Sequence, residues 1–176
     1  MTAVSPTLAR PGFAFRWPLA AGGAALLMLA AAHGFEAMGY APCTLCLRQR
    51  EIYWAIAGVA LLGTLALNRD GLRRYQPALI AVLGMLFLAE AWTAAFHAGV
   101  EWRWWPGPTA CSGGGAVSAG ALGDLLKRGG AHVVRCDQAA WRWLGLSMAG
   151  WNALIAFALA AFSAWASART ARLIRG

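Results

Sequence analysis

Long apolar segments separated by short polar stretches dominate the pattern of this 176-residue chain. Four such segments lie at about 18–35, 45–67, 77–98 and 144–166. Each is close to the roughly 17–25 mostly apolar residues that an α-helix needs to cross the hydrocarbon core of a membrane. The pattern predicts an all-α membrane protein. We expect a single domain, 1–176, folded as a four-helix transmembrane bundle with outer loops at about 36–44 and 99–143.

Two of these spans admit other interpretations. The purely apolar part of the second span, from Ile52 to Leu67, is short for a crossing, so this span must include the residues just before it. That requirement places Cys46 and Arg50 at the membrane surface. The first span follows basic residues and ends among alanines, which is also the pattern of a cleavable secretory signal. We expect it to be an uncleaved anchor.

Composition and charge support a membrane protein and give its orientation. Hydrophobic residues make up 60% of the chain and charged residues only 12%, whereas soluble domains are about 45–50% apolar. The short segments on one side of the spans carry eight basic residues: Arg10, Arg16, Arg69, Arg73, Arg74, Arg169, Arg172 and Arg175. The opposite side holds the other seven, but four of these, Arg103, Lys127, Arg128 and Arg135, lie in the long outer loop, where the positive-inside rule counts less. By this rule the first side, with both termini, is cytoplasmic. The net charge of +8 therefore reflects orientation, and we infer no nucleic-acid binding from it.

A C-x-x-C motif, Cys43 to Cys46, stands at the start of the second span. If Pro42 is the first helical residue, both cysteines and Arg50 fall on one helix face. The helix N-terminus and a nearby guanidinium favour a thiolate, so the motif predicts a reactive dithiol. Arg50 is equally well explained as an interfacial anchor that reaches the lipid headgroups. Arg48 points about 160° away from Arg50 on an ideal helix, and we assign it that anchor role.

The third predicted span carries two polar residues, Glu90 and His97, seven apart and therefore on one face. An ionisable residue at membrane depth is costly and is a functional candidate by default. A hydrogen-bonded or neutral carboxyl inside the bundle is the alternative for Glu90. His97 lies near the outer end of the span, where an interfacial residue without chemistry is an equal alternative.

The second outer loop is longer than a connection between two helices requires, which is typical of a loop with a function of its own. It holds the other two cysteines, Cys111 and Cys136, and glycines flank Cys111, so a disulfide there could swing. Four cysteines allow three pairings. The C-x-x-C spacing makes Cys43 with Cys46 the natural local pair, and this leaves Cys111 with Cys136. On the predicted topology all four face outward, where disulfides persist in a bacterial envelope.

Other uses of four cysteines remain open. Two purely structural disulfides are one alternative, although a C-x-x-C loop closes few residues and stabilises little. A zinc site of four thiolates is another, but Cys111 and Cys136 lack the close paired spacing of zinc ribbons. Haem attachment is unsupported, because Leu47 and not histidine follows the motif. We therefore expect no metal.

The arrangement resembles the disulfide bond formation protein B (DsbB) family of bacterial inner-membrane thiol oxidases. The similarity runs through the whole chain: Pro42-Cys43-Thr44-Leu45-Cys46 with Arg50, His97, Pro106-Gly107-Pro108-Thr109-Ala110-Cys111, Cys136, and Trp141-Arg142-Trp143-Leu144-Gly145-Leu146-Ser147-Met148. Arg48 and Gln49 depart from the aromatic and acidic pair of some members, and the resemblance implies no role for Glu90.

The resemblance implies a relay between two cysteine pairs. A reduced periplasmic DsbA-like thiol oxidase would attack the Cys111–Cys136 disulfide at Cys111, and Cys136 would exchange with Cys43. Cys46 would pass electrons to ubiquinone, or to menaquinone without oxygen. Arg50 matches the quinone-contacting arginine of the family, and His97 matches the histidine near the quinone ring. The partners implied are thus a DsbA-like protein, the membrane quinone pool and the lipid bilayer.

Two other classes compete with this interpretation. A four-helix redox enzyme of the vitamin K epoxide reductase type also couples C-x-x-C to a quinone, but there the motif is expected close to the last span. A membrane scaffold with structural disulfides would tolerate loss of Arg50 and would resist mild reductants.

Overall fold

The computed structural model describes residues 13–68, 72–108 and 135–175. Within these ranges the chain forms four long helices: α1 (Phe13–Ala37), α2 (Thr44–Leu67), α3 (Gln76–Glu101) and α5 (Met148–Arg175). A 3₁₀ turn, η1 (Arg73–Tyr75), leads into α3, and a small hairpin of β1 (Arg142–Trp143) and β2 (Leu146–Ser147) precedes α5. All four helices are long and apolar enough to span a membrane, which confirms the predicted four-helix transmembrane fold.

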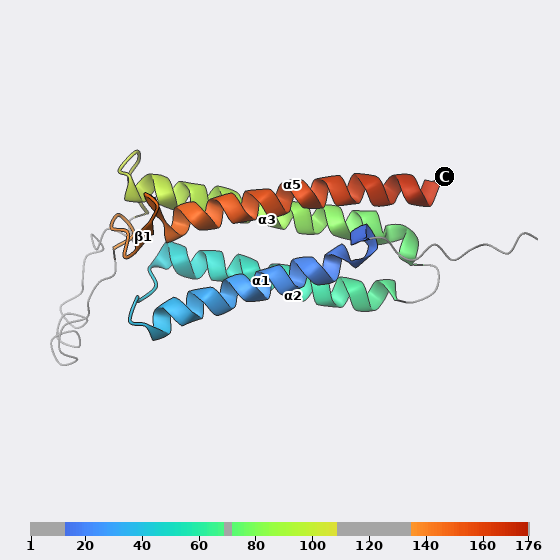
Figure 1. Cartoon of the computed structure of the whole chain (residues 1–176), viewed down its shortest axis with the longest axis horizontal. Helices are drawn as coiled ribbons and strands as arrows, with labels where there is room; N and C mark the ends of the chain where they lie inside the picture. Colours follow the sequence, from blue (N-terminus) through green and yellow to red (C-terminus); the bar gives the residue numbers. More distant parts are fainter. Residues whose placement is uncertain (1–12, 69–71, 109–134, 176) are drawn as a thin grey trace, which may run out of the picture.

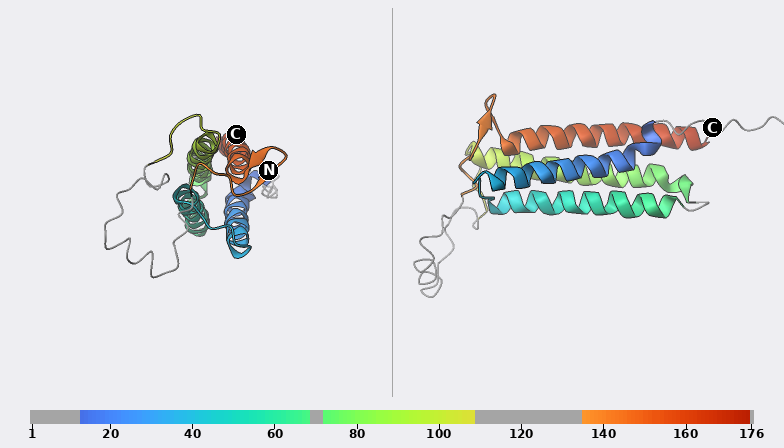
Figure 2. Two further views of the ribbon diagram at one scale, coloured as in Figure 1. Left: turned by 90° about the vertical axis from the view of Figure 1, so that its left-hand side faces the viewer. Right: turned by 60° about the horizontal axis from the view of Figure 1, so that its bottom comes forward.

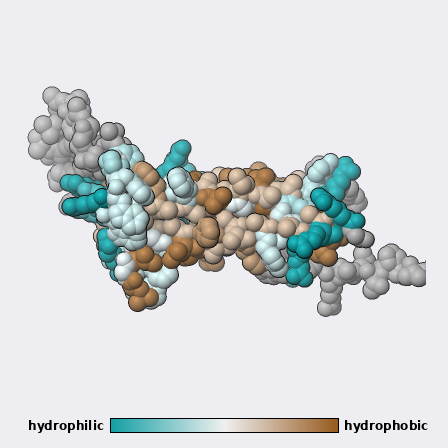
Figure 3. Space-filling view, turned by 90° about the horizontal axis from the view of Figure 1, so that it is seen from above, coloured by the Kyte–Doolittle hydropathy of each residue, from teal (hydrophilic) through white to brown (hydrophobic). Residues whose placement is uncertain are grey.

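The helices run antiparallel to their neighbours along the chain and form an elongated bundle (Figures 1 and 2). The start of α1 and the end of α5 lie at one end. The opposite end carries Cys43, Cys46 and Cys136, and we call it the cysteine end. Apolar residues cover the middle of the bundle and hydrophilic residues gather at its two ends (Figure 3), as expected for a protein that crosses a bilayer.

Small residues bring the helices close together. A Cβ built on Gly22 of α1 would lie 3.0 Å from the Cβ of Ala60 on α2, and one on Gly84 of α3 would lie 3.0 Å from the Cβ of Ser163 on α5. Such small-residue contacts are typical of membrane helix packing, because lipid leaves little hydrophobic drive between helices. The bundle is accordingly built from two tight pairs, α1 with α2 and α3 with α5, whereas α1 and α5 pack sparsely against each other.

Two predicted helix starts at the cysteine end are wrong, and at the other end α1 and α5 extend beyond the predicted spans, from Phe13 and to Arg175. The last helix begins at Met148 and not near residue 144, because Leu144 and Gly145 form the two-residue turn of the β1–β2 hairpin with φ values of 49° and 82°. Positive φ at both positions is characteristic of a type I′ hairpin turn. At the second span Pro42 is not the first helical residue, because Cys43 is the N-cap and its sulfur accepts a hydrogen bond from the backbone N–H of Cys46.

Among the glycines whose surroundings the structure describes, Gly99, near the end of α3, is the position where an added methyl group has the least room. Its Cβ would lie 2.0 Å from Cζ2 of Trp105, whose indole is held by a hydrogen bond to the carbonyl of Phe96. We expect Gly99→Ala to destabilise the protein by about 1–3 kcal/mol, the usual cost of overpacking. Gly58→Ala is the matched control, because a Cβ there meets nothing within 4 Å. Thermal unfolding in detergent should show a lower midpoint for Gly99→Ala alone, and equal midpoints would contradict the packing described.

Candidate functional site

The two cysteines of the C-x-x-C motif face each other at the first turn of α2. Their sulfur atoms lie 2.8 Å apart, and both residues are free thiols. Cys43 is buried, with 5% of its surface exposed, and Cys46 is half-buried. The local sequence explains this placement, because an N-cap side chain turns back toward the first N–H groups of its helix.

Cys43 holds the proton that the two sulfurs share. The hydrogen bond to Cys46, and then burial, raise the pKa of the Cys43 thiol above its usual range. Cys43 therefore donates, and Cys46 is the sulfur that accepts. Since the thiolate is the reactive form of cysteine, the arrangement directs reactivity to Cys46.

We expect Cys46 to be alkylated before Cys43 when the reduced protein is treated with iodoacetamide at neutral pH. The raised pKa keeps Cys43 protonated, and its burial shields it. Its share of modification should rise only at strongly alkaline pH. Residue-resolved mass spectrometry measures the order. Cys43→Ala, which removes the thiol donor, should slow modification of Cys46, and faster labelling of Cys43 in the unmodified protein would contradict this assignment.

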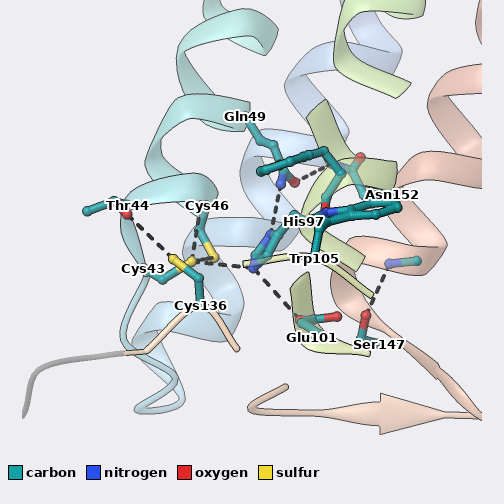
Figure 4. Close-up of polar contacts among 12 residues, drawn as sticks. Cys43, Thr44, Cys46, Gln49, His97, Glu101, Trp105, Cys136, Ser147 and Asn152 are labelled. Atoms are coloured by element: carbon teal, nitrogen blue, oxygen red, sulfur yellow. Dashed lines mark hydrogen bonds and ion pairs between the residues drawn. The ribbon is translucent and has the colours of Figure 1, made fainter. Parts of the chain in front are cut away.

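His97 of α3 lies beside the dithiol (Figure 4). Its Nε2 is 3.6 Å from the sulfur of Cys43, and its Nδ1 is 3.0 Å from Nε2 of Gln49. The ring is buried, with 4% exposed, and Nε2 also lies 3.8 Å from a carboxylate oxygen of Glu101. The structure thus brings together the motif and the histidine, although they are 54 positions apart in sequence.

Cys136 lies next to the motif as well. It is buried, takes part in a disulfide, and packs in one cluster with Cys43, Leu45 and Val100. Its sulfur lies 3.5 Å from Oγ1 of Thr44. The fourth predicted cysteine, Cys111, lies outside the described residues. The position of Cys136 is nevertheless suited to exchange with Cys43, because sulfur-to-sulfur attack needs direct access.

A cavity of about 410 Å³ extends from the dithiol into the bundle. Apolar side chains of α1 and α5 form much of its wall, including Leu29, Phe35 and Ile155. Cys46, Arg50 and His97 line it together, so three of the residues singled out in the sequence meet at one space. The volume falls in the range of small-molecule sites, which are mostly apolar with a few placed polar groups.

Arg50 is held in place at this cavity. Its guanidinium donates to Oε2 of Glu36 at 2.5 Å and to the carbonyl of Ala32 at 3.1 Å, both on α1. Only 13% of the Arg50 side chain is exposed. Arg48, by contrast, is 71% exposed and pairs with Glu51 on the surface. The predicted divergence of the two arginines is therefore observed.

Sequence reasoning missed a chain of buried polar side chains behind His97. Gln49, Tyr53, Glu90 and Asn152 connect through hydrogen bonds of 2.5–2.7 Å. Gln49 and Tyr53 are four residues apart in α2, so their shared face could have been read from spacing. The link to Asn152 of α5 could not, because it depends on how the helices pack.

The site has partial metal-binding character. The ligand atoms of Cys43, Cys46 and His97 all lie within 4.8 Å of one another. Cys136 cannot add a thiolate to this group while it is part of a disulfide. This argues against the alternative of a zinc site with four thiolate ligands.

Comparison with known proteins agrees with the chemistry of the site. The family profile described as "Disulfide bond formation protein DsbB" matches residues 14–166. A curated protein of Nitrosospira multiformis, named "Disulfide bond formation protein B", is 29% identical over 141 residues, which are 69% of this chain and 71% of that protein. No solved structure matches the chain significantly.

Proposed function

The chain belongs to the DsbB family of disulfide bond formation proteins, and on that premise we propose that it is a thiol:quinone oxidoreductase. It would reoxidise a DsbA-type dithiol oxidase of the periplasm and pass the electrons to membrane quinone. The observation that carries this proposal is that Cys46 forms part of the wall of a cavity that also holds Arg50 and His97. A dithiol beside a space of small-molecule size can reduce what binds there.

The residues present fit a quinone ring. The cavity offers apolar walls from α1 and α5 for the ring and its isoprenoid tail, and polar groups on α2 and α3 for its oxygens. When bound, a quinone accepts the two electrons and two protons that oxidation of a dithiol releases. Arg50 would stabilise negative charge on a ring oxygen, because a fixed cation acts strongly where water is excluded. Ubiquinone, or menaquinone without oxygen, is the proposed cofactor.

The cysteines would work as two pairs in sequence. A thiolate of the partner attacks Cys111 of a Cys111–Cys136 disulfide, and Cys136 leaves as a thiolate. The second thiolate of the partner then attacks the mixed disulfide and releases Cys111, so the partner is oxidised and this pair is reduced. Cys136 then attacks Cys43 of an oxidised Cys43–Cys46 pair, and Cys46 leaves as a thiolate at the cavity. Cys111 attacks Cys136 of this mixed disulfide, which restores the Cys111–Cys136 disulfide and releases Cys43, so that both electrons lie on the Cys43–Cys46 pair. The buried cluster shared by Cys43 and Cys136 supports the exchange between these two cysteines.

We propose that the chain sits in the bacterial inner membrane with its cysteine end in the periplasm. Arginines near the start of α1 and the end of α5, among them Arg16, Arg172 and Arg175, support cytoplasmic termini through the positive-inside rule. A periplasmic cysteine end would place the disulfide chemistry in an oxidising compartment.

A coupled assay tests the proposal. The purified protein, given a reduced DsbA-type partner and a short-chain ubiquinone, should oxidise the partner and reduce one quinone for each pair of thiols lost. Thiol titration and quinone absorbance measure the two sides. Omitting quinone should stop turnover after the stored disulfides are spent. The proposal would be contradicted if oxidation of the partner continued without any quinone. It would also be contradicted if the folded protein did not oxidise the partner at all.

A further inference from the structure

Glu90 is a buried carboxyl that the proposed electron transfer does not use. It lies on α3, fully buried, seven residues before His97. Its Oε1 accepts a hydrogen bond of 2.7 Å from Nδ2 of Asn152. Its Oε2 has no hydrogen-bond partner in the described part of the chain. Any role of Glu90 must therefore act through the hydrogen bond between its Oε1 and Asn152.

The Asn152 amide is fixed from three sides. Nδ2 also donates to Oε1 of Gln49 at 2.7 Å, and Oδ1 accepts from the hydroxyl of Tyr53 at 2.5 Å. Of these neighbours, Tyr53 and Gln49 could each pair equally well with a reversed amide, because a hydroxyl and an amide can both donate and accept. We take Glu90 as ionised, and Oε1 of a carboxylate can only accept. Glu90 is therefore the group that decides which edge of Asn152 faces α3.

The orientation of Asn152 determines that of Gln49 and then that of His97 (Figure 4). Oε1 of Gln49 faces Asn152, so its Nε2 faces Nδ1 of His97 at 3.0 Å and donates to it. Nδ1 must then carry a lone pair. A neutral imidazole has one N–H, which is left on Nε2. That nitrogen lies 3.6 Å from the sulfur of Cys43 and 3.8 Å from a carboxylate oxygen of Glu101, and both of these atoms can accept from it.

We propose that Glu90 is a positioning residue that acts through Asn152 and Gln49 to hold His97 in the Nε2–H tautomer. His97 then presents a donor to the sulfur of Cys43, which favours negative charge on that sulfur during exchange, and it cannot take the thiol proton at this nitrogen. If the amides of Asn152 and Gln49 were reversed, the proton would lie on Nδ1, and Nε2 could accept the thiol proton of Cys43 as a base. This catalytic consequence rests on the proposed function; the tautomer itself does not.

Nitrogen NMR of protein labelled with ¹⁵N-histidine tests the tautomer without any turnover. The wild-type His97 signals, assigned by their absence in His97→Ala, should show a proton on Nε2 alone. Glu90→Leu removes the acceptor and should give a mixture of both tautomers. Glu90→Gln, whose amide can donate to Asn152 as well as accept from it, should also admit the Nδ1–H form, in a smaller share than Glu90→Leu does. Ser163→Ala, a buried polar change elsewhere in the bundle, is the matched control and should leave the signals unchanged.

A wild-type proton on Nδ1, or a folded Glu90→Leu variant with an unchanged single tautomer, would overturn the inference. If Glu90→Leu does not fold, Asn152→Leu interrupts the same chain and should produce the same mixture. A correct tautomer together with a failed quinone assay would refute the proposed function alone.

Discussion

Replacement of Cys46 by serine is expected to abolish quinone reduction with a reduced DsbA-type partner. Cys46 is the accepting sulfur of the dithiol and lines the cavity, and a serine oxygen can neither form a disulfide nor carry the electrons. Steady-state quinone absorbance should fall to the background rate. In this variant the Cys43 thiolate can still attack Cys136 of the Cys111–Cys136 disulfide and release Cys111 as a thiol, so a trapped Cys43–Cys136 disulfide should accumulate and be visible on non-reducing gels.

Thr93→Ala is the control for this variant. Thr93 is on the same α3 as His97, but its hydroxyl only bonds the carbonyl one turn earlier, at Ala89. Its replacement should leave the rate unchanged. Residual quinone reduction by folded Cys46→Ser well above background would show that electrons leave by another group, and the assignment of Cys46 would fail.

Arg50→Ala is expected to have the second largest effect, a loss in kcat/KM for quinone on the order of 10²-fold, as for removal of one fixed charge-stabilising donor. The guanidinium is held at the cavity wall by Glu36 and Ala32, so it is positioned before any ligand enters. Quinone titrations of the purified variant measure the loss. Exchange between the partner and the cysteines should continue for one turnover, because Arg50 has no role in it.

Arg48→Ala is a close control, since it removes the same charge two residues away. Its ion pair with Glu51 is exposed and worth little, so activity should stay near wild type. Glu36→Gln separates two roles of Arg50, because it breaks the ion pair and keeps the guanidinium. If Glu36→Gln lost as much activity as Arg50→Ala, Arg50 would act by joining α1 to α2. Equal, unimpaired activity of Arg50→Ala and Arg48→Ala would show that Arg50 takes no part in quinone reduction.

The parts of the fold that follow from local periodicity were predictable. Span lengths gave the four helices, and the opposite directions of Arg48 and Arg50 follow from the helical repeat alone. The exact starts of α2 and α5 were not predictable. One depends on a cysteine side chain acting as a cap, and the other on a leucine, Leu144, at positive φ, where leucine is rarely found.

Contacts between different helices could not be predicted from the sequence. The spacing of Glu90 and His97 correctly gave them one face of α3, but it could not show that Asn152 and Gln49 connect them. His97 was associated with the cysteines only through the family resemblance. The ion pair of Arg50 with Glu36 was also missed, because a turn of uncertain geometry separates them. Such contacts are set by helix packing, which no single helix encodes.

The most direct test of the central claim is a single turnover of the protein alone. The Cys43–Cys46 pair is reduced, excess reductant is removed, and one short-chain ubiquinone is added per protein in detergent without a partner. We predict that one quinone is reduced and that mass spectrometry finds a new Cys43–Cys46 disulfide. If the quinone stays oxidised while the folded protein keeps both thiols, the cavity beside Cys46 is not where this dithiol gives up its electrons.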